Sequence, residues 1–302
     1  MWFRRVLTWG CPAVLLVLLF WHRATVDAGT DALGHADPEW LALAAAAVAS
    51  TWIAASCCQL GATTARLPFS RVFAVQVAGS FLNHVLPAGT GVATLNLRML
   101  RRSGLTRGHA ASAVSLNAAA GIIVHVLALA VLFGFDPKVG HLPGAVFLGL
   151  IVAALAAAGV FLLAWRLSAR FARWTAALRS AFDQTKTVLR RPARAVLLWV
   201  GSAAIPALHI VTLIAVLHAL GLPAPIILIA LAYLGASALA ALVPTPGGFG
   251  SLDVALVAAL AGVGVGATPA IAVVISYRLL TVWIPLLPGA ATLLLLVRRR
   301  VI

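Results

Sequence analysis

A run of proline and glycine interrupts a long apolar stretch in the second half of the chain. The apolar segment 226–266 contains the sequence Pro-Thr-Pro-Gly-Gly-Phe-Gly at residues 244–250. Proline lacks a backbone donor and glycine loses much conformational entropy on folding, so a regular helix cannot continue through this run. Hydrocarbon tolerates such a break only where the freed backbone groups are buried in protein or line a cavity. If the chain lies in a membrane, the run is therefore a candidate site.

The composition places the chain in a membrane. Of the 302 residues, 63% are hydrophobic and only 10% are charged, and the mean hydropathy is +1.06, far from the balance of a soluble domain. The formal net charge is +15, but the basic residues lie between apolar segments and no soluble module remains to bind nucleic acid. We expect an all-α polytopic membrane protein that forms a single membrane domain over residues 1–302, with no nucleic-acid partner.

Six apolar segments are about long enough to cross a bilayer as single helices: residues 6–21, 40–60, 109–133, 144–165, 195–219 and 270–297. All of the 22 Lys and Arg residues except Arg23, Lys138 and Arg278 fall on one side of this topology, the side that carries both termini. Cytoplasmic loops are enriched in Lys and Arg, so the bias predicts cytoplasmic termini. We expect a multi-pass protein of a bacterial-type inner, or cell, membrane.

Two further apolar segments are interrupted in the middle. Segment 72–97 is broken at Leu-Pro-Ala-Gly-Thr-Gly, residues 86–91, and both of its flanks are basic. Only about ten residues separate this break from Arg98, roughly 15 Å of helix, which cannot cross a hydrocarbon core of about 30 Å. We therefore expect a re-entrant helical hairpin that enters and leaves on the cytoplasmic side.

The second interrupted segment, 226–266, has no basic flank and is expected to enter the membrane from outside. The halves 1–165 and 195–302 then have inverted topology, with one broken hairpin in each. In transporters, interrupted helices at corresponding positions of inverted halves indicate a binding site near the bilayer midplane.

The connector between the halves, residues 166–194, is a candidate interfacial helix. Its apolar residues recur at helical spacing, and Arg and Lys fill the polar positions. A helix of this kind lies along the headgroups of an anionic leaflet. A plain cytoplasmic linker whose charge only sets the topology is the alternative interpretation.

Two charged residues lie within the apolar segments of the second half. Arg278 is about nine residues into the last span, where an arginine is costly unless it is paired or faces water. Its candidate partners are Asp253, which closely follows the Pro-Gly run, and a lipid phosphate. The two breaks would also present backbone N–H groups and the positive ends of helix dipoles to an anionic headgroup. A purely structural ion pair is the alternative.

These residues together resemble a known family. Residues 244–250 followed by Asp253 resemble the PxPGGxGxxE signature of the lysylphosphatidylglycerol synthase transmembrane, or flippase-like, family. The segment with Asn83, Leu86-Pro87, Gly89, Gly91 and Arg98 is similar to its N…LPxGxG…R segment, and Tyr277-Arg278-Leu279 with Pro285 and Gly289 resembles its closing helix. The resemblance covers roughly residues 40–297 and implies a polytopic membrane protein that moves or accommodates lipids.

The chain departs from the family pattern in two respects. Asp253 stands where the family usually has the longer Glu, which affects the reach toward Arg278. No segment fits the soluble aminoacyltransferase domain of the bifunctional members, so we expect the membrane module alone, without lysyl transfer.

We expect a flippase-like protein that translocates or accommodates an anionic phospholipid or lipid-linked headgroup. A non-catalytic scaffold that recruits a cytoplasmic partner through residues 166–194 is the alternative, and an intramembrane lipid transferase is a third. No nucleophile and base pair is visible, and the histidines lack the spacing of a metal site, so we expect no enzyme, cofactor or metal. The sequence does not distinguish a monomer from a homo-oligomer. The expected substrate-binding residues are Asn83, Pro87, Gly89, Gly91, Arg98, Pro244, Pro246, Gly247, Gly248, Gly250, Asp253 and Arg278.

Overall fold

The computed structural model describes residues 36–86, 90–135, 185–188, 190–242, 248–299 and 301–302, together with Thr245 and the single positions 17, 23, 27, 30 and 34. The described residues form helices and contain no strand, which confirms the all-α prediction. The α-helices are α3 (Pro38–Gly61), α4 (Phe69–Val85), α5 (Thr90–Arg102), α6 (Arg107–Phe135), α9 (Pro192–Ala219), α10 (Ile226–Leu242), α11 (Ser251–Gly262), α12 (Ala267–Arg278) and α13 (Ile284–Arg298), with a π-helical turn, η4 (Leu279–Trp283), between the last two.

Four stretches of the described residues are long and apolar enough to cross a membrane: Pro38–Gly61, Arg107–Leu132, Pro192–Ala219 and Ala267–Arg298. They correspond to four of the six predicted spans. The predicted spans 6–21 (apart from Val17) and 144–165, and most of the connector 166–194, lie outside the described residues. Helices α10 and α11 are equally apolar but shorter, with 17 and 12 residues.

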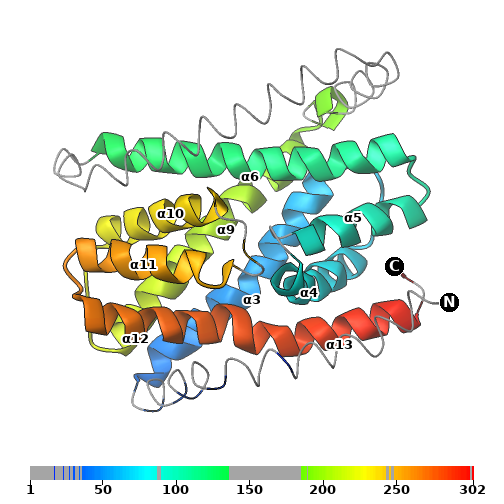
Figure 1. The fold of residues 1–302 in the computed structure, drawn as a ribbon. Coiled ribbons are helices and arrows are strands. Elements are labelled where there is room, and N and C mark those ends of the chain that lie inside the picture. Colours follow the sequence, from blue (N-terminus) through cyan, green and yellow to red (C-terminus); the bar gives the residue numbers. More distant parts are fainter. Residues whose placement is uncertain are drawn as a thin grey trace.

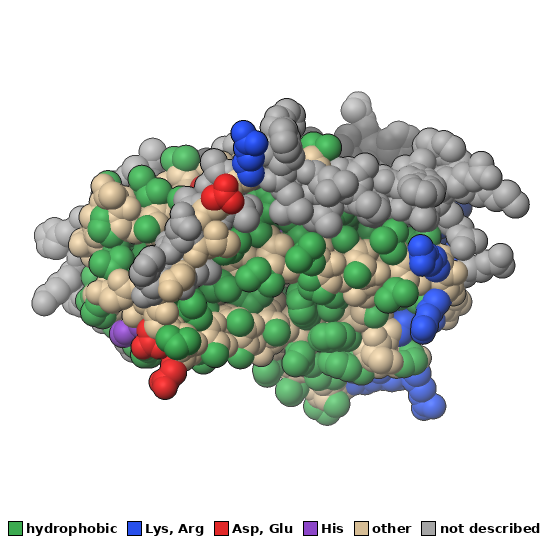
Figure 2. All heavy atoms as spheres, turned by 90° about the horizontal axis from the view of Figure 1, so that it is seen from below, with side chains coloured by type: hydrophobic (Ala, Val, Ile, Leu, Met, Phe, Trp, Pro, Cys, Tyr) green, Lys and Arg blue, Asp and Glu red, His purple; other side chains and the backbone are tan. Residues whose placement is uncertain are grey.

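The charged side chains separate toward the two ends of the long axis. Figure 2 shows most of the described Lys and Arg side chains at the end where α5 and α13 finish, acidic side chains and a histidine at the other, and an apolar surface between them. The last turns of these two helices carry Arg101, Arg102 and Arg298, whereas α3 starts at the opposite end with Asp37 as its N-cap and Glu39 in its first turn. An apolar band between polar ends is the surface of a protein that spans a bilayer.

Helices α3 and α9 are antiparallel and form the most extensive contact among the described helices. Glycine makes their close approach possible, because a Cβ atom on Gly201 would lie 2.7 Å from the backbone nitrogen of Cys58. Hydrogen bonds tie both ends of the pair. The Asp37 amide donates to the Ala219 carbonyl over 3.0 Å, and the Arg194 guanidinium donates to the carbonyls of Leu60 and Ala65. Small residues at such interfaces are typical of helix packing in membranes.

Helices α4 and α5 form the first helical hairpin, and α10 and α11 form the second. In Figure 1 the hairpins extend from opposite ends of the molecule, and both breaks lie near its middle. The first hairpin spans residues 69–102 rather than the predicted 72–97, because the helices continue into the basic flanks. The second spans residues 226–262 rather than 226–266, because the chain turns at Gly264 and Gly266, which have φ values of 97° and 81°. Each Pro-Gly break is therefore flanked by two helices that pack against each other.

The last apolar stretch differs from the single regular helix predicted for residues 270–297. Helix α12 ends at Arg278, the next five residues form the π-helical turn, and α13 continues with Pro285 near its start and Pro288 inside it. Single π-turns within α-helices are rare and frequently lie at functional sites. This one follows Arg278 directly.

Candidate functional site: a polar cavity where the two hairpins meet

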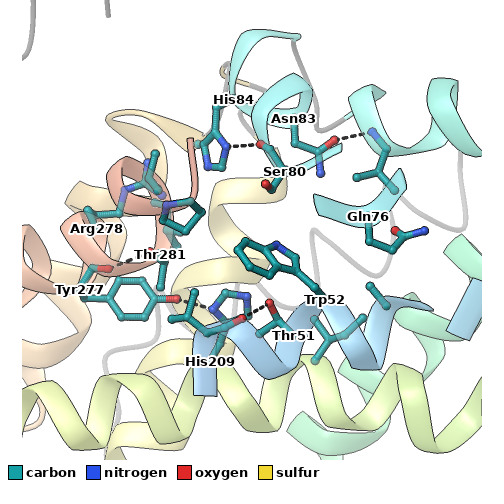
Figure 3. Close-up of a pocket in the computed structure, with 18 of the residues that line it drawn as sticks. Thr51, Trp52, Gln76, Ser80, Asn83, His84, His209, Tyr277, Arg278 and Thr281 are labelled. Carbon is teal, nitrogen blue, oxygen red and sulfur yellow. Dashed lines mark hydrogen bonds between the residues drawn. The ribbon is translucent and has the colours of Figure 1, made fainter. Parts of the chain in front are cut away.

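A cavity of about 490 Å³ lies between the broken ends of the two hairpins. Small-molecule sites typically have volumes of about 300–1,000 Å³. Helices α3, α4, α6, α9, α10 and α12 and the π-turn all contribute polar side chains to the wall (Figure 3). These side chains are Thr51, Gln76, Ser80, Asn83, His84, Asn117, His209, Tyr233, Tyr277, Arg278 and Thr281. The helix bundle therefore contains a partly open cavity whose wall combines apolar surface with many hydrogen-bonding groups.

Arg278 is the charged side chain in the described wall of this cavity. Its side chain is only 7% exposed, and its Nε atom lies 2.8 Å from Oδ1 of Asp253, whose side chain is 33% exposed. The guanidinium carbon also lies 5.2 Å from the ring centroid of Phe249, within the range of a cation–π contact. The candidate partner Asp253 thus reaches Arg278 despite being shorter than the Glu that the family usually has. Burial of the arginine is compensated on one side by a carboxylate and on another by an aromatic ring.

The backbone at the start of α11 explains the position of Asp253. Gly250 precedes the helix with φ = 80°, a left-handed conformation that favours glycine. Its amide donates to Oδ2 of Asp253 over 2.9 Å. Glycine has no side chain to return this bond, so only the acidic half of a capping box is present. One carboxylate therefore caps α11 through Oδ2 and neutralises Arg278 through Oδ1.

The start of α5 is also occupied by a side chain of the protein. Oδ1 of Asn83, on α4, accepts the Val92 amide over 2.8 Å. Gly91 lies so close to α4 that a Cβ atom would meet the backbone of Leu82 and Asn83. We expected the breaks to offer backbone N–H groups to a ligand, but at Val92 and Gly250 these donors are already bonded. Among the described groups, the cavity's positive charge therefore comes from Arg278 rather than from these two amides.

A cluster of aromatic and imidazole rings forms another part of the wall. Nδ1 of His209 lies 2.9 Å from the Tyr277 hydroxyl, and Tyr233 stacks on His209 with ring centroids 5.7 Å apart. On the opposite side, Nδ1 of His84 contacts the Ser80 carbonyl (Figure 3). A carbonyl only accepts, so this Nδ1 carries the proton and Nε2 is the acceptor nitrogen of the neutral ring.

A further polar cluster links α3, α6 and α9 beside the cavity. The Cys58 thiol donates to Oδ1 of Asn117 over 2.7 Å and lies 3.0 Å from the Ser202 hydroxyl. Nδ2 of Asn117 donates to Oε1 of Gln59 over 2.9 Å. Asn117 also lines the cavity, so this cluster holds the Asn117 amide group in place in the cavity wall.

The structure brings only some of the predicted site residues to the cavity. Asn83, Gly248 and Arg278 line it. Gly91 supports the first hairpin, and Gly250 and Asp253 hold Arg278 from the second. Arg98 lies further along α5, is partly buried, and is not among the described residues that line the cavity. Pro87, Gly89, Pro244, Pro246 and Gly247 lie outside the described residues.

Several cavity residues were not predicted from the sequence. Gln76, Asn117, His209 and Tyr233 lie on four different helices and share no motif. The only signal available was that each is a polar residue within an apolar segment, which in a membrane is costly unless the side chain faces protein or water.

In the described part of the chain, the helical fold, the four long apolar stretches, the two helical hairpins and the buried arginine beside the cavity define a polytopic integral membrane protein. The chain belongs to the family described as the lysylphosphatidylglycerol synthase transmembrane region, whose profile matches residues 4–289. This membership relates the protein to lipid handling. A search of curated protein sequences returns no match to the chain.

Proposed function

We propose that the protein is a flippase-like translocator of an anionic phospholipid or lipid-linked headgroup in the cell membrane. The observation that carries the proposal is the position of Arg278, which is 7% exposed and borders a polar cavity at the meeting point of two broken helices. An arginine at membrane depth is costly and usually marks a pathway or ligand site. A phosphate is the chemical group that a guanidinium recognises best in a lipid headgroup.

The cavity supports recognition of the headgroup rather than of the whole lipid. Its volume of about 490 Å³ suits a small polar ligand. The amide groups of Gln76 and Asn83 each bond a neighbouring residue through one atom and have a second atom for headgroup hydroxyls. Trp52 adds an apolar surface. The acyl chains then stay in the bilayer while the headgroup passes through the protein.

The arrangement of the hairpins supports alternating access to this cavity. The two hairpins start at opposite ends of the molecule (Figure 1), one of which carries most of the described basic side chains (Figure 2). In the proposed orientation the basic end faces the cytoplasm, as the positive-inside rule requires. Movement of either tip would open the cavity to one leaflet, as in transporters built from inverted repeats.

Reconstitution into vesicles tests the proposal. The protein is placed in phosphatidylcholine vesicles that contain headgroup-labelled phosphatidylglycerol, and the label accessible from outside is followed over time. We expect wild-type protein to move the labelled headgroup, and Arg278→Gln to lose at least tenfold in rate. Arg299→Gln, at an exposed position, removes the same charge outside the cavity and is expected to keep the wild-type rate. No movement with folded wild-type protein, or equal rates for the wild type and Arg278→Gln, would refute it.

Cysteine labelling tests the orientation of the hairpins. In a cysteine-free background, Thr90→Cys beside the first break is expected to react with a membrane-impermeant reagent added from the cytoplasmic side. Thr245→Cys, in the second break, is expected to react from outside. Labelling of Thr245→Cys only from the cytoplasmic side would contradict the inverted arrangement.

A further inference from the structure

The ion pair leaves the site electrically neutral before a ligand binds. Arg278 and Asp253 carry opposite charges, and their Nε and Oδ1 atoms are 2.8 Å apart. The other titratable side chains that face the pair come from four different helices and are neutral as imidazoles and phenols. They are His84 of α4, His209 of α9, Tyr233 of α10 and Tyr277 of α12. The charge of the guanidinium is therefore already compensated by Asp253 before an anionic ligand binds.

Binding of an anionic headgroup would disturb this neutrality. A phosphodiester that takes the place of Asp253 at Arg278 leaves a carboxylate without its cation, and the site gains one negative charge. An uncompensated charge in a low-dielectric interior is unfavourable, and a buried group avoids this cost by changing its protonation state. The phosphodiester is a strong acid and remains ionised, so Asp253 is the group that can take up a proton.

The geometry of Asp253 suits proton uptake. Its Oδ2 atom accepts the Gly250 amide, and only Oδ1 faces the guanidinium. Oδ1 itself is buried, but the side chain of Asp253 as a whole is 33% exposed, against 7% for Arg278. The exposed part of the carboxylate side chain thus gives a route to Asp253 that does not cross the guanidinium. Protonation at Oδ1 ends the ion pair but leaves the capping hydrogen bond at Oδ2 in place.

We propose, resting on the translocator function above, that the anionic headgroup binds at Arg278 together with one proton, which Asp253 takes up. In this step the guanidinium of Arg278 exchanges its ion pair with the carboxylate for one with a phosphate oxygen, and the O–H bond forms on Oδ1. Arg278 stays a guanidinium throughout. Release reverses the step: the proton leaves Asp253, and the carboxylate recovers Arg278. The protein then moves lipid and proton in the same direction, in a one-to-one ratio.

The coupling has a defined dependence on pH. The complex holds one proton more than the free protein, so affinity for the anionic lipid rises as pH falls. For one proton per ligand, the dissociation constant changes up to tenfold per pH unit.

Calorimetry on the whole protein in detergent counts the proton directly. Dihexanoyl phosphatidylglycerol is titrated into the protein in two buffers of different ionisation enthalpy at the same pH, and the difference in heat gives the protons taken up. We expect about one proton per lipid bound by linkage. Dihexanoyl phosphatidylethanolamine brings its own ammonium group to the site, so we expect an uptake near zero for it.

Three variants assign the proton. Asp253→Asn keeps an acceptor for Gly250 and removes the carboxylate, so it is expected to bind phosphatidylglycerol without proton uptake and with little dependence on pH. Glu39→Gln removes an exposed acid at the start of α3 and is expected to retain the uptake. Uptake that persists in Asp253→Asn, or that is lost in His84→Gln, would overturn the assignment to Asp253.

The outcome for wild-type protein separates this inference from the proposed function. Binding of phosphatidylglycerol without proton uptake overturns the coupling and leaves lipid binding intact. Failure to bind either lipid contradicts the translocator function itself. The wild-type measurement decides the coupling even if Asp253→Asn does not fold.

Discussion

Removal of Asp253 is expected to destabilise the protein through the charge that it leaves behind. In Asp253→Ala the Arg278 guanidinium keeps its burial, with 7% of the side chain exposed, but loses its carboxylate. Removing one partner of a fully buried pair costs about 3–5 kcal/mol. Because Asp253 is 33% exposed, we take the lower end, about 3 kcal/mol. Loss of the acceptor for the Gly250 amide adds about 1 kcal/mol. The expected total is about 4 kcal/mol.

The double variant Asp253→Ala/Arg278→Met separates these two contributions. Methionine has no charge to leave unpaired, so the double variant is expected to recover about 3 kcal/mol and to retain only the loss of the cap. The free energy of unfolding is measured for the wild type, both single variants and the double variant in mixed micelles with increasing SDS. The difference between the double variant and the sum of the singles gives the coupling between the two residues. If the effects simply add, the ion pair does not stabilise the fold and the reasoning is wrong.

Three further substitutions test the packing that supports the cavity, each by the same unfolding measurement. Gly201→Ala is expected to destabilise the protein by about 1–3 kcal/mol, because its Cβ would lie 2.7 Å from the Cys58 backbone nitrogen. Gly121→Ala is the matched control, since no atom lies within 4 Å of its Cβ, and it should leave the free energy of unfolding unchanged. Gly250→Ala should cost about 1–2 kcal/mol, since an L-residue is strained at φ = 80°; unchanged stability would show that the turn adapts. Asn83→Ala leaves the Val92 amide without its acceptor and should lower the free energy of unfolding by about 1–3 kcal/mol. Amide hydrogens at the start of α5 should also exchange faster. Unaltered exchange there would contradict the capping role.

The sequence by itself determined the helical class, the positions of the described spans and the two breaks. These features depend on local chemistry. A long apolar segment in a bilayer must satisfy its backbone groups internally, which makes it helical, and proline and glycine end a helix wherever they occur together. The sequence also indicated Asp253 as a candidate partner of Arg278, because two charged residues in apolar segments of the same half have few other partners.

Only the tertiary structure decided which surfaces of these helices meet. Val254 and Leu256 are both apolar and lie two residues apart in α11, yet Val254 is 71% exposed and Leu256 is fully buried. When lipid and protein interior are equally apolar, hydrophobic periodicity does not distinguish the two faces. The same reason kept Gln76, His209 and Tyr233 from being assigned to one cavity. The capping of α5 by Asn83 and the π-turn after Arg278 likewise depend on packing between helices, which local sequence patterns do not encode.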